Sequence, residues 1–377
     1  MGKREQFQYS VVGDFLAGRV NRKQASELLE VRERTVTRMA RRVETRKFLG
    51  VVHGNRGRKS EKRVPAELKR DVMGLIESQY FDFNMTHALE ELKRSHGLVV
   101  SYTTLRRWCV SKEMVKRRKR RRGAIRMKRV RMPSEGLMLQ MDGSPHRYNG
   151  KDAWCLIGAI DDATSEIPWA EFFLSEDTLS CMRVLQRIIE LKGVPHAIYT
   201  DRAGIFGGHK RQMFSQFSRA CEELDIQVIF ASSAQAKGRI ERAWDTIQDR
   251  LVPELRIRKI QRMPAANQYL QEQFLANYWA RNNTVAARSS ESRYRKLGAG
   301  RDLNEIFCIK DFRAVKADHT LSWQGDIYAV AAPIKYSLHG QKIEIRTYQN
   351  LTWKAYFAGR EIEIVKFEAP TSLKRAA

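Results

Sequence analysis

The sequence predicts a mixed α/β protein in three parts: an all-α N-terminal region, an α/β core and a small β-rich C-terminal region. Three observations support this prediction. Helical periodicity with polar N-caps dominates residues 7–110, strand-like apolar runs alternate with amphipathic helices over about residues 134–255, and short β-rich runs with glycine turns fill residues 318–367. At 377 residues, the chain is long enough for two to four domains.

The net charge of +26 is unevenly distributed along the chain. Residues 1–135 contain 35 Lys and Arg against 15 Asp and Glu, whereas the remaining residues are nearly balanced at 34 to 28. The N-terminal third is therefore expected to meet a polyanion, with nucleic acid as the first candidate and an anionic membrane as the second. No apolar run approaches the roughly 20 residues of a spanning helix, and the basic segments lack the interleaved aromatic residues of a membrane-surface helix.

No signal peptide is recognisable, so we expect an intracellular protein. Its five cysteines show no C-x-x-C spacing, which indicates reduced thiols and argues against a zinc module.

Residues 1–50 predict a first helix-turn-helix DNA-binding domain with three helices. Asn21 is placed to cap the second helix, at residues 22–30, and the third helix is expected at residues 34–43. The third helix has one apolar side, and its polar side carries the predicted DNA contacts: Arg34, Thr35, Arg38, Arg41 and Arg42. An ordinary three-helix bundle with a basic surface would explain this unit equally well if it stood alone.

Residues 61–112 predict a second helix-turn-helix domain, with helices at 65–78, 86–95 and 101–110. Ser101 is a good N-cap for the last helix, which carries the predicted DNA contacts Tyr102, Thr103, Arg106 and Arg107. Two such units in tandem favour sequence-specific DNA binding over a chance pattern.

Residues 113–133 predict a basic linker. Its segment 116–131 holds eleven basic residues and no acid, a composition that stays extended until phosphates neutralise it. We interpret it as a DNA-tracking connector rather than a solvated tail, with predicted contacts at Lys116, Arg117, Arg118, Lys119 and Arg120.

Residues 134–285 predict the α/β core. Strands are expected at 137–142, 154–161 and 169–174, followed by a helix at 178–191, a strand at 196–201, a helix at 210–224, a strand at 226–231 and a long amphipathic helix up to residue 251. Three consecutive strands followed by alternating helices and strands is the order of an RNase H-like fold, with the first strand central. A further helix at 264–281 is expected to pack back on this core.

Residues 283–317 are polar and predict an irregular linker. Beyond them, strands are expected at 320–323, 326–331, 342–347, 352–357 and 361–367, which predict a small β-barrel over residues 318–368.

Three acids of the core are candidate site residues: Asp142 and Asp201, each at a strand end, and Glu241, in the first turns of the long helix. Any one of them alone would be interpreted as a cap or a surface residue. Asp161 and Asp162 follow a strand and precede Ala-Thr-Ser, so they are interpreted as turn residues, and Arg250 as a plain surface residue.

The segments QMDGSPHRY, CLIGAIDDATSEI, IYTDRAGIF and AQAKGRIERAWDTIQDRL occur in this order around those acids. They resemble the catalytic core of bacterial insertion-sequence transposases of the D-D-E type, in particular the ISNCY-like group, and more distantly the retroviral integrase superfamily and the phage Mu transposase. One departure is Arg202-Ala203-Gly204, where relatives more often carry a Lys-His-type pair.

The resemblance implies that Asp142, Asp201 and Glu241 are both the catalytic residues and the metal ligands. They would hold two Mg²⁺ or Mn²⁺ ions, with Asp142 between the two, and oxygen ligands suit these cations. Lys237, Arg239 and Arg242 flank Glu241 and are candidates to hold the DNA backbone. By analogy with the integrases, the C-terminal barrel is expected to be SH3-like.

The function expected from the resemblance is that of a transposase. It would bind the terminal inverted repeats of a bacterial insertion sequence and catalyse metal-dependent strand cleavage and strand transfer. Its expected partners are double-stranded DNA, as transposon ends and as target, and a second copy of itself in a homodimer or higher homo-oligomer; no membrane is expected, and the location would be cytoplasmic and nucleoid-associated. Two alternatives stay open: a DNA-binding regulator or silent domesticated transposase, and a nuclease of the same fold that performs no strand transfer.

Overall fold

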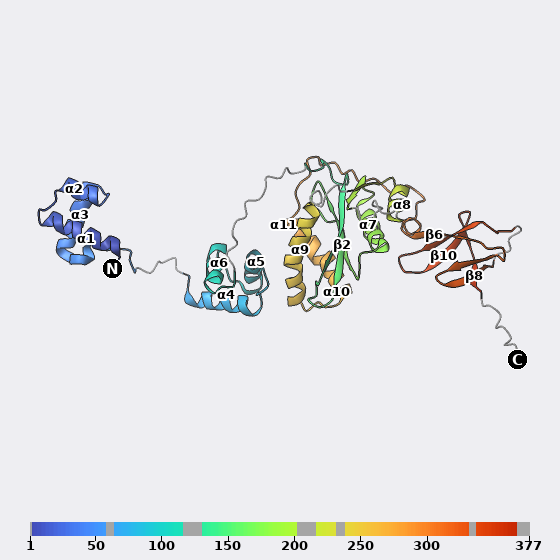
Figure 1. Ribbon diagram of the computed structural model, residues 1–377, viewed down its shortest axis with the longest axis horizontal. Coiled ribbons are helices and arrows are strands. Elements are labelled where there is room, and N and C mark those ends of the chain that lie inside the picture. Colours follow the sequence, from blue (N-terminus) through green and yellow to red (C-terminus); the bar gives the residue numbers. More distant parts are fainter. Residues whose placement is uncertain are drawn as a thin grey trace, which may run out of the picture. The chain divides into compact units, whose positions relative to one another are not determined.

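Residues 2–57, 64–115, 130–201, 216–230, 238–331 and 337–367 are described by the computed structural model (Figure 1). The chain divides into two units, Met1–Asp71 and Val72–Ala377. The predicted DNA contacts Lys116, Arg117, Arg118, Lys119, Arg120 and Lys237 lie outside the described residues.

The first unit is built from α1 (Lys3–Leu16), α2 (Arg22–Leu28), α3 (Glu33–Arg46) and the short 3₁₀ helix η1 (Lys47–Gly50). The predicted cap is confirmed, because the Asn21 side chain accepts a hydrogen bond from the Gln24 N–H at 2.9 Å and the Gln24 Oε1 accepts one from the Asn21 N–H at 2.9 Å. The apolar sides of the three helices form one core: Val11, Val12, Ala25, Leu29, Val36, Met39, Ala40, Val43 and Val51.

Three more helices precede the core: α4 (Ala66–Ser78), α5 (Met85–His96) and α6 (Tyr102–Ser111). Gly97 ends α5 in the left-handed conformation with φ 67°. Ser101 caps α6 as predicted, accepting a hydrogen bond from the Thr104 N–H at 3.2 Å. The three predicted helices are therefore present, whereas their function as a helix-turn-helix unit stays a prediction.

The core is a five-stranded sheet in the order β3-β2-β1-β4-β5. Its strands are β1 (Leu139–His146), β2 (Trp154–Asp161), β3 (Trp169–Phe173), β4 (Ala197–Thr200) and β5 (Gln227–Phe230). The first three pair antiparallel, and β4 lies parallel to both β1 and β5. The first strand is therefore central, as the sequence predicted.

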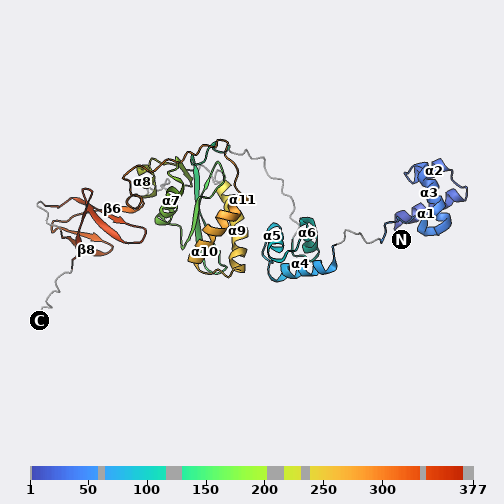
Figure 2. The ribbon, with the colours of Figure 1, turned by 180° about the vertical axis from the view of Figure 1, so that it is seen from behind.

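Helices cover both faces of this sheet, so the core has three layers (Figures 1 and 2). One face packs against α7 (Thr178–Lys192) and α8 (Gln216–Glu223), with Leu139, Met141 and Ile198 contributed by the strands. The other face packs against α9 (Gly238–Ile257) and a continuous helix made of α10 (Met263–Tyr269), the π-helical η4 (Leu270–Trp279) and α11 (Ala280–Asn282). Every residue of β2 is buried because both faces are covered.

The C-terminal strands form two open sheets in the described residues. One has the order β11-β10-β9-β6 and the other β12-β8-β7. Their bounds are β6 (Ile309–Ala314), β7 (Thr320–Trp323), β8 (Asp326–Val330), β9 (Lys342–Thr347), β10 (Trp353–Phe357), β11 (Arg360–Ile362) and β12 (Ile364–Lys366). A closed barrel is not seen in this part of the chain, so barrel closure stays a prediction.

The expectation of an irregular linker over residues 283–317 is wrong for its second half. Residues there form α12 (Leu303–Ile306) and β6. Leu303, Ile306 and Phe307 are buried in the core beside α7 and α8, and β6 then pairs with β9 over six residues. Only three apolar side chains anchor this segment to the core, and the rest of it is polar. Its sequence therefore looks like that of a linker.

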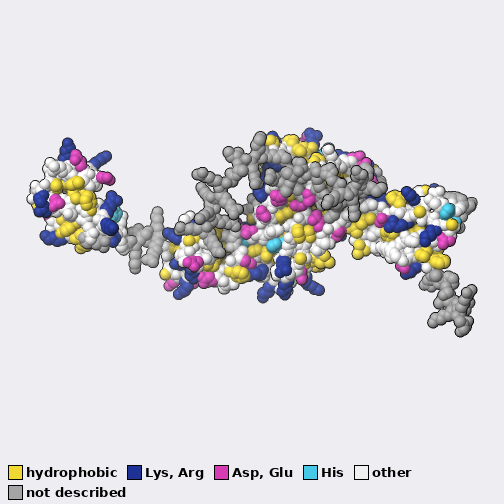
Figure 3. Space-filling model, in the orientation of Figure 1, with side chains coloured by type: hydrophobic (Ala, Val, Ile, Leu, Met, Phe, Trp, Pro, Cys, Tyr) yellow, Lys and Arg dark blue, Asp and Glu magenta, His cyan; other side chains and the backbone are white. Residues whose placement is uncertain are grey.

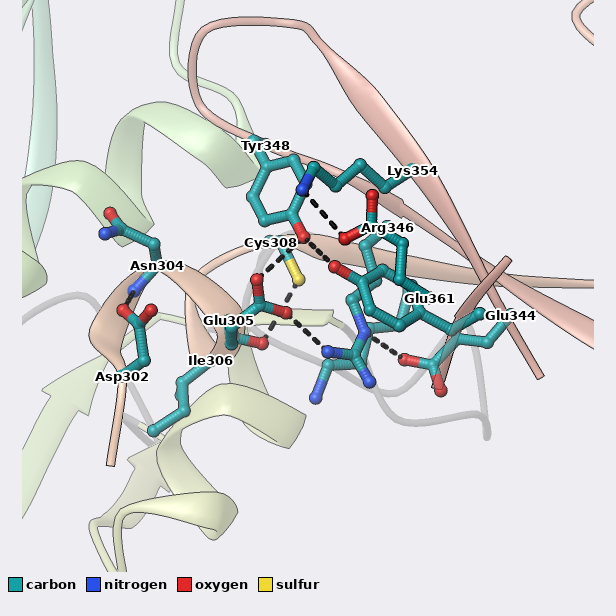
Figure 4. Close-up of polar contacts among 12 residues, drawn as sticks. Asp302, Asn304, Glu305, Ile306, Cys308, Glu344, Arg346, Tyr348, Lys354 and Glu361 are labelled. Carbon is teal, nitrogen blue, oxygen red and sulfur yellow. Dashed lines mark hydrogen bonds and ion pairs between the residues drawn. The ribbon is translucent and has the colours of Figure 1, made fainter. Parts of the chain in front are cut away.

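Glu305 of α12 joins the core to the C-terminal sheets (Figure 4). Its carboxylate pairs with Arg346 of β9 and accepts a 2.8 Å hydrogen bond from Tyr348 OH. Burial raises the pKa of Glu305, but the hydrogen bonds and the charge of Arg346 outweigh it, so its pKa lies below the ordinary range. Arg346 also pairs with Glu344 at 2.8 Å, so its charge has two counter-charges.

Candidate active site

Two of the predicted acids belong to two neighbouring central strands and their ends. In the parallel pair of β1 and β4, Leu139 lies opposite Ile198 and Gln140 opposite Tyr199. The pairing ends at this point and β4 ends at Thr200, so Asp201 is one residue beyond the strand; if the register continued by two residues, Asp201 would be beside Asp142. Neighbouring strands are about 4.8 Å apart, so the two carboxylates would then start from adjacent backbone positions.

Both of these acids lie on the face of the sheet that α9 covers. Leu139 and Met141 of β1 belong to the core on the α7 side, and side chains alternate along a strand, which assigns Asp142 to the opposite face. Ile198 also belongs to the α7 side, and Asp201 is three residues further on. Both acids are half-buried.

Contacts from α9 bracket the position of Asp142 on this face. Two residues before it, the Gln140 Oε1 accepts a hydrogen bond from the Ile240 N–H at 3.4 Å. Two residues after it, the Ser144 hydroxyl accepts one from Gln248 Nε2 at 2.8 Å. The stretch of α9 between residues 240 and 248 therefore faces Asp142.

A close approach between α9 and the sheet fixes this alignment. Asp142 is paired across β1 and β2 with Gly158. A Cβ added at Gly158 would lie 2.7 Å from the Ala170 Cβ and 3.0 Å from the Trp244 Cη2. Only glycine therefore lets the Trp244 ring lie on the sheet beside Asp142.

Glu241 lies one helical turn before Trp244, in the first turn of α9, and its side chain is exposed. In the described residues, no group of three or more His, Cys, Asp or Glu side chains is close enough to hold a metal ion. Asp142 thus lies in β1 on the face that α9 covers, Asp201 directly follows β4, and Glu241 is on α9, but the described residues do not form one cluster from these three acids.

The donor set still fits a hard divalent cation. Carboxylate oxygens are the ligands that Mg²⁺ and Mn²⁺ prefer, and Asp142 in β1 and Asp201 directly after β4 belong to two neighbouring, parallel strands and their ends. Thr200, next to Asp201, has a buried hydroxyl without a hydrogen-bond partner among the described residues. Thr200 is two residues after Ile198, so its side chain is on the α7 side of the sheet, opposite to the acids.

Asp161 and Asp162, at the end of β2, differ from each other. Asp161 is a turn residue as predicted: its Oδ1 accepts from the N–H groups of Ala163 and Thr164 at 2.9 and 3.0 Å. Burial raises the pKa of Asp161, and its backbone hydrogen bonds oppose that rise. Asp162 is fully buried and pairs with Arg239, whose side chain is 14% exposed. The predicted contact between Arg239 and DNA stays a prediction, and the residue it contacts in the structure is Asp162.

The C-terminal half of α9 contacts α5, and here one expectation is wrong. Arg250, expected at the surface, is only 6% exposed, pairs with Glu90 and lies 3.6 Å from the centre of the Tyr278 ring. Glu254 is 5% exposed and accepts hydrogen bonds from His87 Nε2 at 3.1 Å and from Tyr269 OH. Helical spacing alone cannot show that a second helix covers this side of α9.

The predicted DNA contacts on the helices are mostly solvent-facing. Arg34, Arg38, Arg41 and Arg42 of α3 are exposed, and Thr35 is half-buried. On α6, the side chains of Tyr102, Thr103, Arg106 and Arg107 are exposed, as is Arg242 on α9. Lys and Arg side chains are spread over the surface of the first unit in Figure 3. None of the described helices is long and apolar enough to cross a membrane.

Taken together, fold and site define a mixed α/β protein with two acids on or directly after its central parallel strands and a third acid on the helix that covers them. Comparison with known proteins adds the family. The chain is 30% identical over 369 residues to "Putative transposase y4bF" of Sinorhizobium fredii, covering 94% of this chain and 80% of that one. It is 26% identical over 360 residues to "Transposase for insertion sequence IS1202" of Streptococcus pneumoniae, covering 85% and 77%. The chain therefore belongs to the insertion-sequence transposases.

Solved structures give weaker likenesses. The catalytic core domain of HTLV-2 integrase, solved in complex with magnesium, matches 36% of this chain and 85% of its own at 18% identity and a TM-score of 0.30. The simian T-cell lymphotropic virus intasome, solved with a PP2A regulatory subunit, matches 71% and 91% at 14% identity and a TM-score of 0.35. TM-scores this low decide nothing, and no protein-family model matches the chain.

Proposed function

We propose that this transposase binds the terminal inverted repeats of its bacterial insertion sequence and catalyses metal-dependent strand cleavage and strand transfer, on an RNase H-like core. The observation that supports the proposal is the parallel pairing of β1, which carries Asp142, with β4, which directly precedes Asp201, in a sheet whose one face is covered by the helix of Glu241. Membership of the insertion-sequence transposases supplies the class of substrate.

In this proposal Asp142, Asp201 and Glu241 hold two Mg²⁺ or Mn²⁺ ions. When bound, such ions activate the attacking oxygen and stabilise the leaving oxygen of an in-line displacement at phosphorus. Asp142 supplies a carboxylate from a strand and Asp201 one from directly after a strand, whereas Glu241 completes the set from the helix. Because Asp142 is fixed in the sheet, the helix decides whether the third ligand is in reach.

The proposed DNA contacts follow the chain from its basic end to the core. The exposed side chains of α3 and α6 read or hold the terminal repeat, the basic linker tracks phosphates, and Arg242 holds the backbone beside Glu241. Paired ends require at least two copies of the chain when assembled. The protein would act in the bacterial cytoplasm, on nucleoid DNA.

The test uses DNA from both flanks of the encoding gene, with Mg²⁺ or Mn²⁺, and compares the wild type with Asp142→Asn. The wild type is expected to nick at a defined end and to join pre-cut ends to a target plasmid. Asp142→Asn is expected to lose both reactions while its affinity for the ends stays unchanged.

The other outcomes identify the alternatives. End binding without nicking under either metal would contradict the proposal and favour a regulator. Nicking without joining of pre-cut ends would favour a nuclease of the same fold. An Asp142→Asn variant that still cuts would overturn the assignment of the metal site.

A further inference from the structure

We propose that Asp162 is a positioning residue that fixes the first turn of α9, and therefore Glu241, relative to the strand that carries Asp142. The proposal goes beyond the proposed function and rests on it for the role of Glu241. It starts from a buried network that links the end of β2, the strand β1 and the beginning of α9.

The carboxylate of Asp162 has three donors from three parts of the chain. Its Oδ1 accepts from Gln140 Nε2 at 2.8 Å and pairs with the Arg239 guanidinium, and its Oδ2 accepts from the Met132 N–H at 2.9 Å. Asp162 is fully buried. A buried charge needs such partners, because an unpaired one is strongly destabilising.

Two of these connections lead to the N-terminus of α9. Arg239 is the second residue of this helix and stands two residues before Glu241. Gln140 bridges the network to the helix backbone, since its Oε1 accepts from the Ile240 N–H at 3.4 Å while its Nε2 donates to Asp162. Gln140 also stands two residues before Asp142, on the same face of β1. One network therefore joins the helix of Glu241 to the strand of Asp142.

The third connection, from the Met132 N–H, reaches the C-terminal end of the basic linker. Next to Met132, the Arg131 Nη1 donates to the Asp162 carbonyl oxygen at 3.1 Å and to the Ser165 hydroxyl at 2.8 Å. Arg131, the last basic residue of the run 116–131, is thus held by the turn after β2. The linker enters the core at the same buried acid that holds α9.

The charge of Asp162 is what the network requires. Arg239 is mostly buried, so Asp162→Asn removes the counter-charge that Asp162 gives its guanidinium and turns one acceptor oxygen of the network into an NH2 donor. Arg239→Gln is the milder change, because Asp162 keeps its hydrogen bonds from Gln140 and Met132. Arg239→Lys keeps the charge with a single donor group. We expect the first turn of α9 to be disturbed most in Asp162→Asn, less in Arg239→Gln and least in Arg239→Lys.

A matched control exists on the same sheet. Glu171 of β3 is also buried and pairs at 3.0 Å with Arg183, which lies on α7 and not on α9. Glu171→Gln therefore removes an ion pair of a buried acid on the same sheet, with a more exposed arginine at 45%, without touching the helix of Glu241.

Amide hydrogen exchange of the full-length chain tests the proposal without requiring activity. In Asp162→Asn, the amides of residues 239–243 are expected to exchange about tenfold faster than in the wild type, because a hydrogen bond to a charged group is lost. Residues 247–257 of α9 should keep their protection, and Glu171→Gln should leave all of α9 unchanged. Unaltered exchange at residues 239–243 would overturn the proposal.

A second measurement separates positioning from plain support of the fold. It follows the rise in Tm with Mn²⁺ concentration in the absence of DNA. If Asp162 sets Glu241, the half-maximal concentration of Mn²⁺ rises by about tenfold or more in Asp162→Asn and Arg239→Gln, and less in Arg239→Lys. Faster exchange with an unchanged Mn²⁺ response would also overturn the proposal. If the Tm of the wild type does not change with Mn²⁺ and the wild type cuts no DNA, the proposed function is contradicted. The exchange result would still decide whether Asp162 holds α9.

Discussion

The two ends of α9 contain the same kinds of residue and use them differently. At the N-terminal end, Glu241 is exposed in the first turn of α9, and no group in the described residues is shown to pair with it as Glu254 is paired. In the C-terminal half, Glu254 is 5% exposed and is held by His87, by Tyr269 and by Arg258, whose guanidinium lies 2.9 Å away. An acid whose partners are all internal stabilises the fold, whereas an exposed acid is available to a ligand.

The C-terminal half of the helix thus serves as a docking surface for α5 and the residues before it. Arg256 donates to the Asp82 carboxylate at 2.6 and 2.8 Å and to the Gln79 carbonyl oxygen at 2.6 Å. With Arg250 and Glu254, it gives this half of α9 three charged residues that are paired within the chain. We infer that chemistry and docking are separated along one 20-residue helix.

The largest expected effect tests the docking half. Glu254→Gln removes the counter-charge of Arg258 and an acceptor of His87 and Tyr269, so the free energy of unfolding should fall by about 3 to 5 kcal/mol. Urea unfolding at neutral pH measures this loss. A change below about 1 kcal/mol would show that Glu254 is not a stabilising residue and would break the comparison.

The pH dependence of stability tests the contribution of Glu254 separately. Burial raises the pKa of Glu254, but the hydrogen bonds from His87 and Tyr269 and the charge of Arg258 lower it from 4.5 to about 2. A carboxyl whose folded pKa is depressed stabilises the protein above its unfolded pKa and loses this contribution as pH falls through the folded value. The wild type should therefore lose about 3 kcal/mol more than Glu254→Gln between about pH 5 and pH 2. Parallel stability curves for the two proteins would contradict the assignment.

A smaller effect is expected where α9 meets the sheet. In Gly158→Ala, the added methyl group meets the Ala170 methyl and the end of the Trp244 ring, so one of these side chains must move, and stability should fall by about 2 kcal/mol. Gly74→Ala on α4 is the control, because a Cβ there meets no atom within 4 Å and Ala favours helix by about 1 kcal/mol. Thermal unfolding of both variants gives the comparison. Equal shifts in the two variants would show that the approach at Gly158 does not constrain α9.

The smallest effect concerns the rim of the docking surface. Asp82 and Arg256 are 27% and 36% exposed, so solvent screens their pair. A double-mutant cycle with Asp82→Ala and Arg256→Ala should give a coupling of about 1 kcal/mol at low salt, falling as salt is added. A coupling energy as large as the loss of stability in Glu254→Gln would mean that the pair of Asp82 and Arg256, and not the buried Glu254, holds α5.

The sequence predicted the elements well wherever periodicity and caps were decisive. Asn21 and Ser101 cap the helices that were expected after them, and β2, β7 and β9 have the predicted bounds. The position of the first Asp on a central strand also follows from the element order alone. These features depend on neighbours in the chain, which a sequence shows directly.

The sequence did not predict the features that depend on partners distant in the chain. Asp161 and Asp162 look alike in sequence, and only the fold shows that Asp162 reaches Arg239 77 residues away. Arg250 looks like a surface residue because the residues that cover it belong to α5 and η4. Residues 303–314 look like a linker because three apolar side chains suffice to anchor them to the core.

The most direct test of the divided helix compares Glu241→Gln with Glu254→Gln, the same substitution at its two ends. Each variant is assayed for joining of pre-cut ends to target DNA, well below its Tm, and for Tm itself. Glu241→Gln is expected to keep the Tm of the wild type and to lose joining by roughly a thousandfold or more, whereas Glu254→Gln should lower the Tm and still join. A Glu241→Gln variant that joins ends at the wild-type rate would contradict the account.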